Sequence, residues 1–523
     1  MSKSPSSKTR LFDSSSFPFA IGLLAALTGL TSCGGGGASF RQIGGGGGGG
    51  GGGNGAPCTL QAPSTSSASA KLGVGSSGQS TFMDLHVGSS DLVPSVSVPF
   101  GSLRLWDTST GWAQINTSNG VYDFSTLDGF VNSSSGIDLL YNLARTPNWA
   151  SSNPGDSSCA YNSNDFPNGG GNGQCWAPKD LNNDGSGTDQ DWINWVTAVA
   201  QRNAGQYGNK IKYFEIWNEW NIPKFWQGTT AQLVRMEQDA RCVVEGPPVG
   251  LSCNSNSNFP SGKGLDPAAR IVTPSPVGAF QNDLNSVATN LSDFFGTKVD
   301  GIGGGMFADV IGFHGYVGTT ASSGVCPSPE DVNTVVDDLN NTVLSFPTEA
   351  ALKPWFNTEG GWSKASEEGF TDPHRQAAFL ARYFLLQRSL GVDRVYWYRW
   401  DATNTYGGAL WTSSGGPTEA ASAWSEVNQW IVGKTLISAC TANTPGGGST
   451  VWSCGLTSGT WKGLAVWDAG QDCTTTSCPT SSFTVPAGGY TEYLDLAGNK
   501  NTVSGGTVPV GAKPILLETG TLP

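Results

Sequence analysis

Residues 211–221 read Ile-Lys-Tyr-Phe-Glu-Ile-Trp-Asn-Glu-Trp-Asn, a short, mainly apolar run that ends in the polar pair Asn218-Glu219. A second run, Pro354-Trp-Phe-Asn-Thr-Glu359, also ends in a glutamate. Runs of this length that are rich in aromatic and β-branched residues predict buried β-strands. Each of these two strands would therefore place a carboxylate at its carboxyl end, which is the edge where parallel sheets carry their chemistry.

Similar runs extend this pattern in both directions along the chain. The predicted strands are residues 81–86, 102–107, 138–143, 211–217, 270–273, 309–314, 354–359 and 394–398. Helical patterns lie between several of them, as at 191–200 and 374–388. Strand–helix alternation with eight units predicts an α/β fold, a (β/α)8 TIM barrel over residues 71–412. An open doubly wound sheet is the alternative, but no Gly-x-Gly-x-x-Gly motif follows the first predicted strand.

Residues 413–523 change in character. Short alternating runs such as 460–467 and 490–496 are separated by turns rich in Gly, Pro and Thr. Alternation of this kind predicts antiparallel strands with one buried face, so we expect a C-terminal antiparallel β-sandwich domain. Its default role would be structural.

The two strand-end glutamates suggest acid–base and nucleophilic chemistry. An arbitrary glutamate is most often a solvated loop residue, so the argument depends on the motifs around these two. Asn218-Glu219-Trp220 and Thr358-Glu359-Gly-Gly-Trp362 resemble the motifs of the clan A retaining glycoside hydrolases, most closely the family 39 β-xylosidase-like enzymes. Those enzymes carry Asn-Glu after strand four and a second Glu after strand seven. The resemblance covers most of residues 80–520.

This resemblance implies a catalytic assignment. Glu219 would be the general acid/base, with a raised pKa, and Glu359 the nucleophile, with a low pKa. Asn218 would hydrogen-bond the sugar 2-hydroxyl. No metal or organic cofactor would take part in catalysis. Trp220 departs from the commonest clan pattern, in which Pro frequently follows the catalytic Glu.

The same resemblance implies further substrate-binding residues. Arg104 matches an arginine near the nucleophile, where its charge would keep Glu359 ionised. His314 and Tyr316 match a pair that orients the nucleophile and the sugar, and Trp397 matches a platform for a sugar face. Arg104 could instead be part of a structural ion pair, and His314 an ordinary buried histidine.

Two tryptophans in predicted loops are weaker candidates for substrate binding. Trp149 and Trp226 follow the third and fourth predicted strands, where they would stack on further sugar units. The alternative for both is a place in the hydrophobic core, the commoner fate of a tryptophan.

Composition and charge limit the classes of partner that the protein is expected to bind. The 523 residues include 28 Lys and Arg against 41 Asp and Glu, a net charge of −13. Nucleic-acid binding needs clustered positive charge, so this composition argues against it. Few charged residues (13%), with 19 Trp, favour a protein that handles neutral polar ligands. The resemblance implies a carbohydrate substrate, and we expect a monomer.

The N-terminal residues predict export and attachment. Residues 1–33 combine basic residues with a short apolar run that ends in Leu30-Thr-Ser-Cys33, which resembles a bacterial lipoprotein signal with Cys33 as the lipidated residue. An ordinary secretory signal is the alternative. Residues 34–70, with ten consecutive Gly at 44–53, predict a flexible tether. We therefore expect an extracytoplasmic protein, lipid-anchored to a bacterial membrane or cell surface.

The cysteine count is consistent with export. Of the 11 Cys, ten remain without Cys33, an even number that favours disulfides in an exported protein. Spacing suggests the pairs Cys159–Cys175, Cys242–Cys253, Cys440–Cys454 and Cys473–Cys478, which leaves Cys58 with Cys326. Metal binding is the alternative, but the chain has no Cys-x-x-Cys pair and only three His.

One polar loop resembles a calcium site. Asp180, Asn182, Asp184 and Asp191 follow a D-x-N-x-D-G pattern with an acidic residue at position twelve, the spacing of a calcium-binding loop. The alternative is a polar turn that caps the helix beginning near Asp191. A structural calcium ion is therefore one of two interpretations.

Three functions compete at this stage. The first is a retaining glycoside hydrolase that cleaves β-glycosidic bonds of oligo- or polysaccharides through a glycosyl-enzyme intermediate. The second is a non-catalytic carbohydrate-binding surface lipoprotein, and the third a structural surface protein. The presence of both carboxylates in motif favours the first.

Overall fold

The computed structural model describes residues 58–59, 72–88, 97–159, 171–260, 262–278, 286–317, 326–362, 370–401, 408–412, 415–442, 450–474 and 477–523. All of them belong to one compact unit, Asn54–Pro523. The predicted signal segment 1–33, its lipidated Cys33 and nearly all of the predicted tether 34–70 lie outside the described residues.

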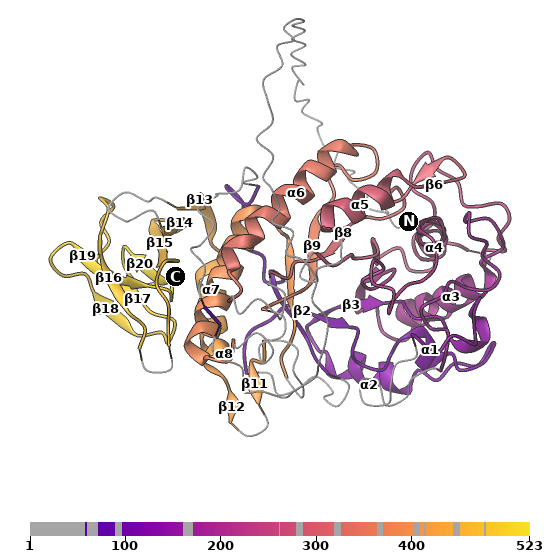
Figure 1. The fold of residues 1–523 in the computed structure, drawn as a ribbon, viewed down its shortest axis with the longest axis horizontal. Helices are drawn as coiled ribbons and strands as arrows, with labels where there is room; N and C mark the ends of the chain where they lie inside the picture. Colours follow the sequence, from indigo (N-terminus) through magenta and orange to yellow (C-terminus); the bar gives the residue numbers. More distant parts are fainter. Residues whose placement is uncertain are drawn as a thin grey trace, which may run out of the picture. The chain divides into compact units, whose positions relative to one another are not determined.

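Eight parallel strands form the central sheet (Figure 1). In spatial order they are β5 (Arg270–Val272), β4 (Ile211–Glu215), β3 (Asp138–Asn142), β2 (Ser102–Leu105), β1 (Met83–His86), β10 (Arg394–Trp397), β9 (Trp355–Gly360) and β8 (Ile311–His314). A parallel bridge between Val272 and Val310 joins β5 to the start of β8 and nearly closes the ring. The predicted barrel is therefore confirmed, and each predicted strand coincides with one observed strand.

Helices cover the outside of the ring. They are α1 (Trp112–Ile115), α2 (Ser125–Ser133), α3 (Gln190–Gly205), α4 (Thr230–Val244), α5 (Val287–Gly296), α6 (Val332–Ser345), α7 (Pro373–Leu390) and α8 (Glu419–Ile431), with 3-10 turns at Asn148–Ala150 and Pro329–Asp331. Two small hairpins pair β6 (Lys298–Val299) with β7 (Ile302–Gly303) and β11 (Trp411–Thr412) with β12 (Gly416–Pro417).

Helix ends follow local capping chemistry. At the start of α7, the Asp372 side chain accepts hydrogen bonds from two backbone amides, and Pro373 occupies the first turn. The helix ends at Gly391, whose φ of 83° is the left-handed conformation that glycine adopts without strain. These signals fix α7 as a long helix that runs beside the C-terminal strands (Figure 1).

The C-terminal domain is an antiparallel sandwich, as predicted. One sheet has the order β13 (Thr435–Ala442), β14 (Val451–Ser458), β15 (Trp461–Asp468), β20 (Ile515–Glu518), β17 (Glu492–Leu494) and β18 (Lys500–Thr502). The second pairs β16 (Thr480–Thr484) with β19 (Thr507–Gly511). Val466, Phe483 and Val510 belong to the apolar cluster between the two sheets.

Helix α8 precedes this sandwich. Trp424 of α8 meets Phe384 of α7 edge to face, with 4.9 Å between ring centroids. This contact places α8 in the helical layer around the barrel. The predicted domain boundary between residues 412 and 413 falls before this helix.

All five predicted disulfides are present: Cys58–Cys326, Cys159–Cys175, Cys242–Cys253, Cys440–Cys454 and Cys473–Cys478. Five disulfides in one chain are typical of proteins outside the reducing cytosol. Within the described part of the chain, no helix combines the length and apolar character needed to span a bilayer.

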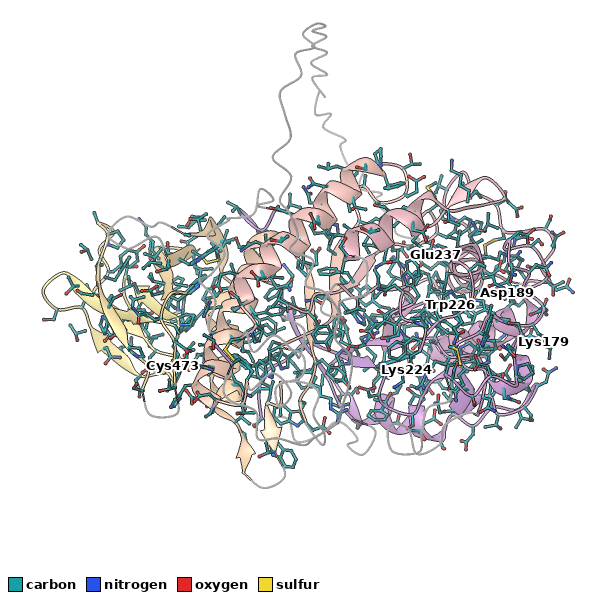
Figure 2. All side chains as sticks on the ribbon, in the orientation of Figure 1. Lys179, Asp189, Lys224, Trp226, Glu237 and Cys473 are labelled. Atoms are coloured by element: carbon teal, nitrogen blue, oxygen red, sulfur yellow. A yellow bond between two sulfur atoms is a disulfide. The ribbon has the colours of Figure 1, made fainter. Side chains whose placement is uncertain are left out.

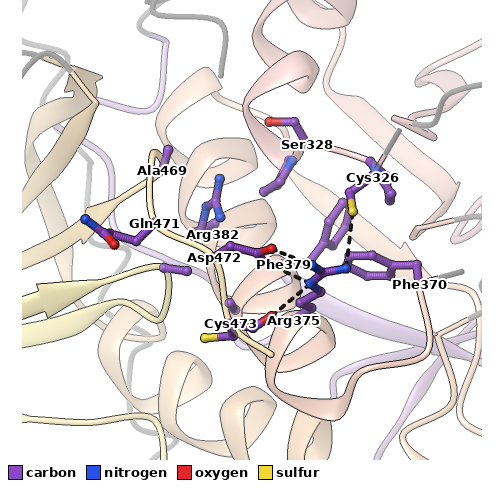
Figure 3. A pocket seen from close by; sticks show the side chains of 14 residues that line it. Cys326, Ser328, Phe370, Arg375, Phe379, Arg382, Ala469, Gln471, Asp472 and Cys473 are labelled. Atoms are coloured by element: carbon purple, nitrogen blue, oxygen red, sulfur yellow. Dashed lines mark hydrogen bonds and ion pairs between the residues drawn. The ribbon is translucent and has the colours of Figure 1, made fainter. Parts of the chain in front are cut away.

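Arg375 on α7 joins three segments beside the first of these disulfides. Its guanidinium donates to the Cys58 carbonyl (3.2 Å), to Asp472 Oδ1 (2.8 Å) and to the Cys473 carbonyl (2.8 Å). Figure 3 shows Arg375 between Cys326 and the loop that carries Asp472 and Cys473. Neither Glu219 nor Glu359 is among the residues that line the cavity in this view.

We expect the Cys58→Ser/Cys326→Ser double variant to lose about 2–5 kcal/mol of unfolding free energy. The reason is that this disulfide joins residues 268 positions apart, which restricts the unfolded chain strongly. Urea unfolding without reductant measures the loss. The Cys473→Ser/Cys478→Ser variant is the matched control, because that bridge spans only 5 positions, and an equal or larger loss in the control would contradict the prediction.

Candidate active site

Two distant glutamates meet at the carboxyl ends of the barrel strands. Glu219 lies just after β4 and Glu359 lies within β9. Three atoms lie within 4.8 Å of one another: one carboxylate oxygen of each glutamate and a ring nitrogen of His314, at the end of β8. Both glutamates are 7% exposed. The barrel thus brings the two predicted carboxylates into one nearly closed site.

Both oxygens of Glu359 are held by hydrogen bonds. Arg104 on β2 donates from Nη1 to Oε2 (2.8 Å), and the Tyr316 hydroxyl donates to Oε1 (2.8 Å). Two donors from different strand ends fix the carboxylate plane and favour its ionised form. Arg104 and Tyr316, both predicted from the sequence, therefore orient Glu359.

Arg104 is itself anchored by a buried carboxylate. Its Nε donates to Glu215 Oε2 (2.7 Å), while its Nη2 donates to Asn218 Oδ1 (2.7 Å). Glu215 also accepts hydrogen bonds from Asn142 (2.8 Å) and Ser275 (2.6 Å). This network fixes the Arg104 side chain at 0% exposure and so fixes the position of Asn218. Arg104 is therefore in a buried ion pair and also contacts the candidate nucleophile, so the two interpretations of this residue hold together.

Glu215, Asn142 and Ser275 were not predicted from the sequence. Glu215 did leave a signal, because a charged residue inside the apolar run Tyr-Phe-Glu-Ile needs a charge partner or hydrogen-bond donors if it is buried. Asn142 and Ser275 left none, since polar residues at strand ends are common.

Glu219 is held in an uncommon backbone conformation. Its φ of 41° is in the left-handed region, which costs a non-glycine residue about 1–2 kcal/mol. The Glu219 amide donates to the Ser275 carbonyl (2.8 Å), and Asn218 forms a parallel β-bridge with Ser275. His314 Nδ1 lies 2.9 Å from Glu219 Oε1. These contacts aim the Glu219 carboxyl group at the shared site.

Burial dominates the electrostatics of the site. It raises the pKa of Glu219 well above its usual value, and the negative charge of Glu359 raises it further. Burial also lowers the pKa of His314 well below its usual value, as does the charge of Arg104, so the imidazole is neutral near pH 7. A neutral His314 can donate from Nδ1 to an ionised Glu219.

The expected low pKa of Glu359 is wrong. Burial raises it to about 7, against the opposing charge of Arg104. Desolvation of a carboxylate in a nearly closed site outweighs one adjacent guanidinium. Glu359 nevertheless keeps two hydrogen-bond donors that favour its charge, one of them cationic. Glu219 has a neutral imidazole as its partner instead, so Glu359 is the member of the pair that ionises first.

The three predicted tryptophans have different surroundings. Trp397 on β10 is 0% exposed, and its Nε1 donates to the Gly408 carbonyl (2.7 Å). Its ring packs among other aromatic rings and offers no face to a sugar, so the predicted sugar platform is wrong. Trp149 is half-buried, donates to the Asn116 carbonyl (2.8 Å) and has Lys179 Nζ over its ring at 5.1 Å.

The prediction that Trp226 stacks on a sugar unit is wrong. It is 5% exposed and meets Trp217 edge to face at 4.8 Å. Its ring lies among packed side chains (Figure 2) and offers no open face to a sugar, because the loop after β4 folds back on the core.

The predicted calcium loop begins with a helix cap. Asp180 Oδ2 accepts hydrogen bonds from the backbone amides of Gln190 (2.5 Å) and Asp191 (3.3 Å), in the first turn of α3. Asp191 itself lies 3.6 Å from Lys179 Nζ. These contacts fit the capping alternative.

The remaining residues of that loop bind each other. Asp184 Oδ1 accepts from the Ser186 amide (2.9 Å), and Asn182 donates to the Ser186 hydroxyl (3.0 Å). Among the residues that the structure describes, groups of three acidic, His or Cys side chains converge within 4.8 Å only at Glu219-His314-Glu359 and Asp156-Cys159-Cys175. The three acidic members of the predicted set, Asp180, Asp184 and Asp191, are in neither group.

Comparison with known proteins gives structural neighbours. No protein-family model matches the chain, and no curated protein matches it. A family 39 glycoside hydrolase from the gut symbiont Bacteroides cellulosilyticus WH2 superposes with a TM-score of 0.55 at 16% identity, covering 83% of this chain and 80% of that one. The GH39 enzyme from Xanthomonas axonopodis pv. citri gives a TM-score of 0.51 at 16% identity, with 88% and 98% covered. The chain therefore shares the fold of these enzymes, as the motifs predicted.

Proposed function

We propose that the protein is a retaining glycoside hydrolase that cleaves β-glycosidic bonds in oligo- or polysaccharides. One observation supports this most strongly: oxygens of Glu219 and Glu359 approach within 4.8 Å across one buried site. Retaining enzymes hold their two carboxyl groups about 5–5.5 Å apart, whereas inverting enzymes need about 6.5–9.5 Å to admit a water molecule. The short approach favours retention.

In the first step, Glu359 attacks the anomeric carbon and forms a glycosyl ester. The bond to the leaving oxygen breaks as Glu219 gives its proton to that oxygen. Arg104 and Tyr316 hold the attacking carboxylate in position. The raised pKa of Glu219 keeps it protonated for this step.

In the second step, Glu219 acts as a base. It takes a proton from water while the water oxygen attacks the anomeric carbon, and the ester bond to Glu359 breaks. The Glu359 carboxylate is released and the free sugar leaves. His314 is a positioning residue for Glu219 in both steps. We propose that Asn218, fixed by Arg104, binds the sugar 2-hydroxyl.

The test uses a panel of 4-nitrophenyl β-glycosides and β-linked oligosaccharides, with xylosides assayed first. Proton NMR of the first-released sugar on the best substrate then gives the stereochemistry. We expect the β anomer, which mutarotates later. Release of the α anomer would contradict retention, and sugar binding without hydrolysis would favour a non-catalytic binding protein.

We also propose that this activity is extracytoplasmic. The five disulfides support export. Attachment through Cys33 rests on the sequence alone, and incorporation of labelled palmitate, lost in Cys33→Ser, would test it.

A further inference from the structure

A third carboxylate lies beside the catalytic pair. Asp107 follows β2 directly after Trp106, three positions beyond Arg104. Its side chain is 11% exposed, against 9% for those of Glu219 and Glu359. Burial is the main cause of the raised pKa of both glutamates, and the charge of Asp107 adds to each. Asp107 is thus close enough to act electrically on both.

Asp107 is held from one side by an arginine. Its Oδ2 is buried and lies 3.7 Å from Arg399 Nη1, just after β10. Arg399 Nε in turn donates to the Asp401 carbonyl (2.5 Å) and lies 3.6 Å from the Asp401 carboxylate. The Gly88 amide donates to Asp401 (3.0 Å). Residues at the ends of β1, β2 and β10 therefore fix the direction of the Asp107 carboxylate.

The Asp107–Arg399 separation is too long for a direct hydrogen bond. The Tyr398 hydroxyl is a second donor that faces the Asp107 carboxylate, and Oδ2 has no closer hydrogen-bond partner among the described residues, which leaves it under-satisfied. A sugar hydroxyl both donates and accepts, so it can satisfy a carboxylate and a guanidinium together. The partly exposed side of Asp107 is the surface that such a ligand would cover.

We propose that Asp107 is a specificity-determining residue that accepts hydrogen bonds from hydroxyl groups of the sugar bound next to Glu359, and that it selects neutral over acidic sugars. This inference rests on the proposed function. Asp107 and Asp401 flank Arg399, and Glu215 and Glu359 flank Arg104, so carboxylates outnumber guanidiniums around this corner. A carboxylate-bearing sugar would meet like charge here, whereas a neutral hydroxyl finds an acceptor.

The test compares wild type with Asp107→Asn and Asp107→Ala on 4-nitrophenyl β-xyloside, β-glucoside and β-glucuronide. A hydrogen bond to a charged group is worth about ten- to a hundredfold in kcat/KM, so we expect a loss of that size on the best neutral substrate, mainly through KM. The ratio of kcat/KM for the best neutral substrate to kcat/KM for the glucuronide should fall by a similar factor. Asp123→Asn is the control, because Asp123 is exposed and lies outside the site.

Monodeoxy analogues of the best substrate give a test that needs no folding of a variant. For the wild type, kcat/KM should be about ten- to a hundredfold lower on the analogue that lacks the bound hydroxyl than on the parent substrate. In Asp107→Ala, kcat/KM should be nearly the same for that analogue as for the parent substrate. The reason is that the variant and the analogue each remove the same hydrogen bond. Equal losses in both proteins would overturn the inference and leave the proposed function standing.

Sugar binding separates the two proposals further. Calorimetric titration of the neutral monosaccharides into Glu359→Gln, with and without Asp107→Asn, reads binding without turnover. Weaker binding in the double variant supports the inference even if no substrate is hydrolysed. If no glycoside is hydrolysed and no sugar binds, the proposed function and this inference both fail.

Discussion

Glu359→Gln is expected to lower kcat by roughly 10⁴- to 10⁶-fold, the scale seen when a nucleophile with no substitute is removed. Glutamine keeps the size of the side chain: its carbonyl oxygen can still accept from Arg104, and its NH2 group can donate to the Tyr316 hydroxyl. It cannot form the glycosyl ester on which the proposed double displacement depends. Steady-state kinetics on the best substrate give kcat, and calorimetry should show that sugar affinity is retained.

Glu219→Gln is the matched variant, because it alters the other carboxylate of the same pair. We expect it to keep ester formation with a nitrophenyl leaving group, which departs without protonation, and to slow hydrolysis of the ester. Added azide should restore turnover by replacing the water that Glu219 no longer activates, yielding the β-glycosyl azide. Turnover by Glu359→Gln near the wild-type rate would end the assignment.

The second large effect concerns the stability of the fold. It involves Asp189 and Asp239, two buried acidic residues that take no part in the proposed catalysis. Asp189 precedes α3 with a φ of 49° and is fully buried (labelled in Figure 2). Its side-chain hydrogen-bond partner is Asp239, to which the protonated Asp189 carboxyl group donates, and its oxygens have no other partner among the described residues. Burial raises its pKa well above the usual value, and the charges of Asp239 and Asp180 raise it further, against Arg235. Burial also raises the pKa of Asp239 to about 7.

These shifts make the folded state less stable as the pH rises. A folded pKa above the unfolded value means that the folded protein holds more protons, so unfolding free energy falls with pH above about 4. The fall continues through the folded pKa values, including about 7 for Asp239. Arg235 compensates one charge only, through its 2.7 Å pair with Asp239.

Asp189→Asn should therefore stabilise the protein at pH 8, by about 1–3 kcal/mol, the cost of an unsatisfied buried polar group. Asparagine has the same shape, tolerates the left-handed backbone and offers an amide donor to Asp239. Urea unfolding at pH 5 and pH 8 measures the change, and the pH dependence should become flatter. Asp123→Asn is the exposed control. A variant less stable than wild type at pH 8 would contradict this account.

Much of the fold could be predicted because its signals are local. The barrel strands are short apolar runs, and Asn218-Glu219 and Glu359 end two of them, so strand order alone brings these residues to one edge. Cysteine spacing was informative for the same reason, since short separations limit the available partners. Cys58–Cys326 followed only by elimination.

Long-range packing accounts for what the sequence left open. Glu215 pairs with Arg104 from a neighbouring part of the ring, and no sequence spacing encodes that contact. The pKa of Glu359 depends on how completely the site is closed, which outweighs its arginine neighbour. Trp226 was misplaced because a loop tryptophan and a core tryptophan look alike in sequence, and the polar loop at Asp180 caps a helix with the residue types that also suit calcium.

The most direct measurement traps the covalent intermediate. Wild type is incubated with the 2-deoxy-2-fluoro derivative of its best substrate carrying a dinitrophenyl leaving group, which slows the second step more than the first. Peptide mass spectrometry then locates the bound sugar. We expect one fluoroglycosyl ester, on Glu359, and none in Glu359→Gln. A label on another residue, or continued hydrolysis with no labelled peptide, would contradict it.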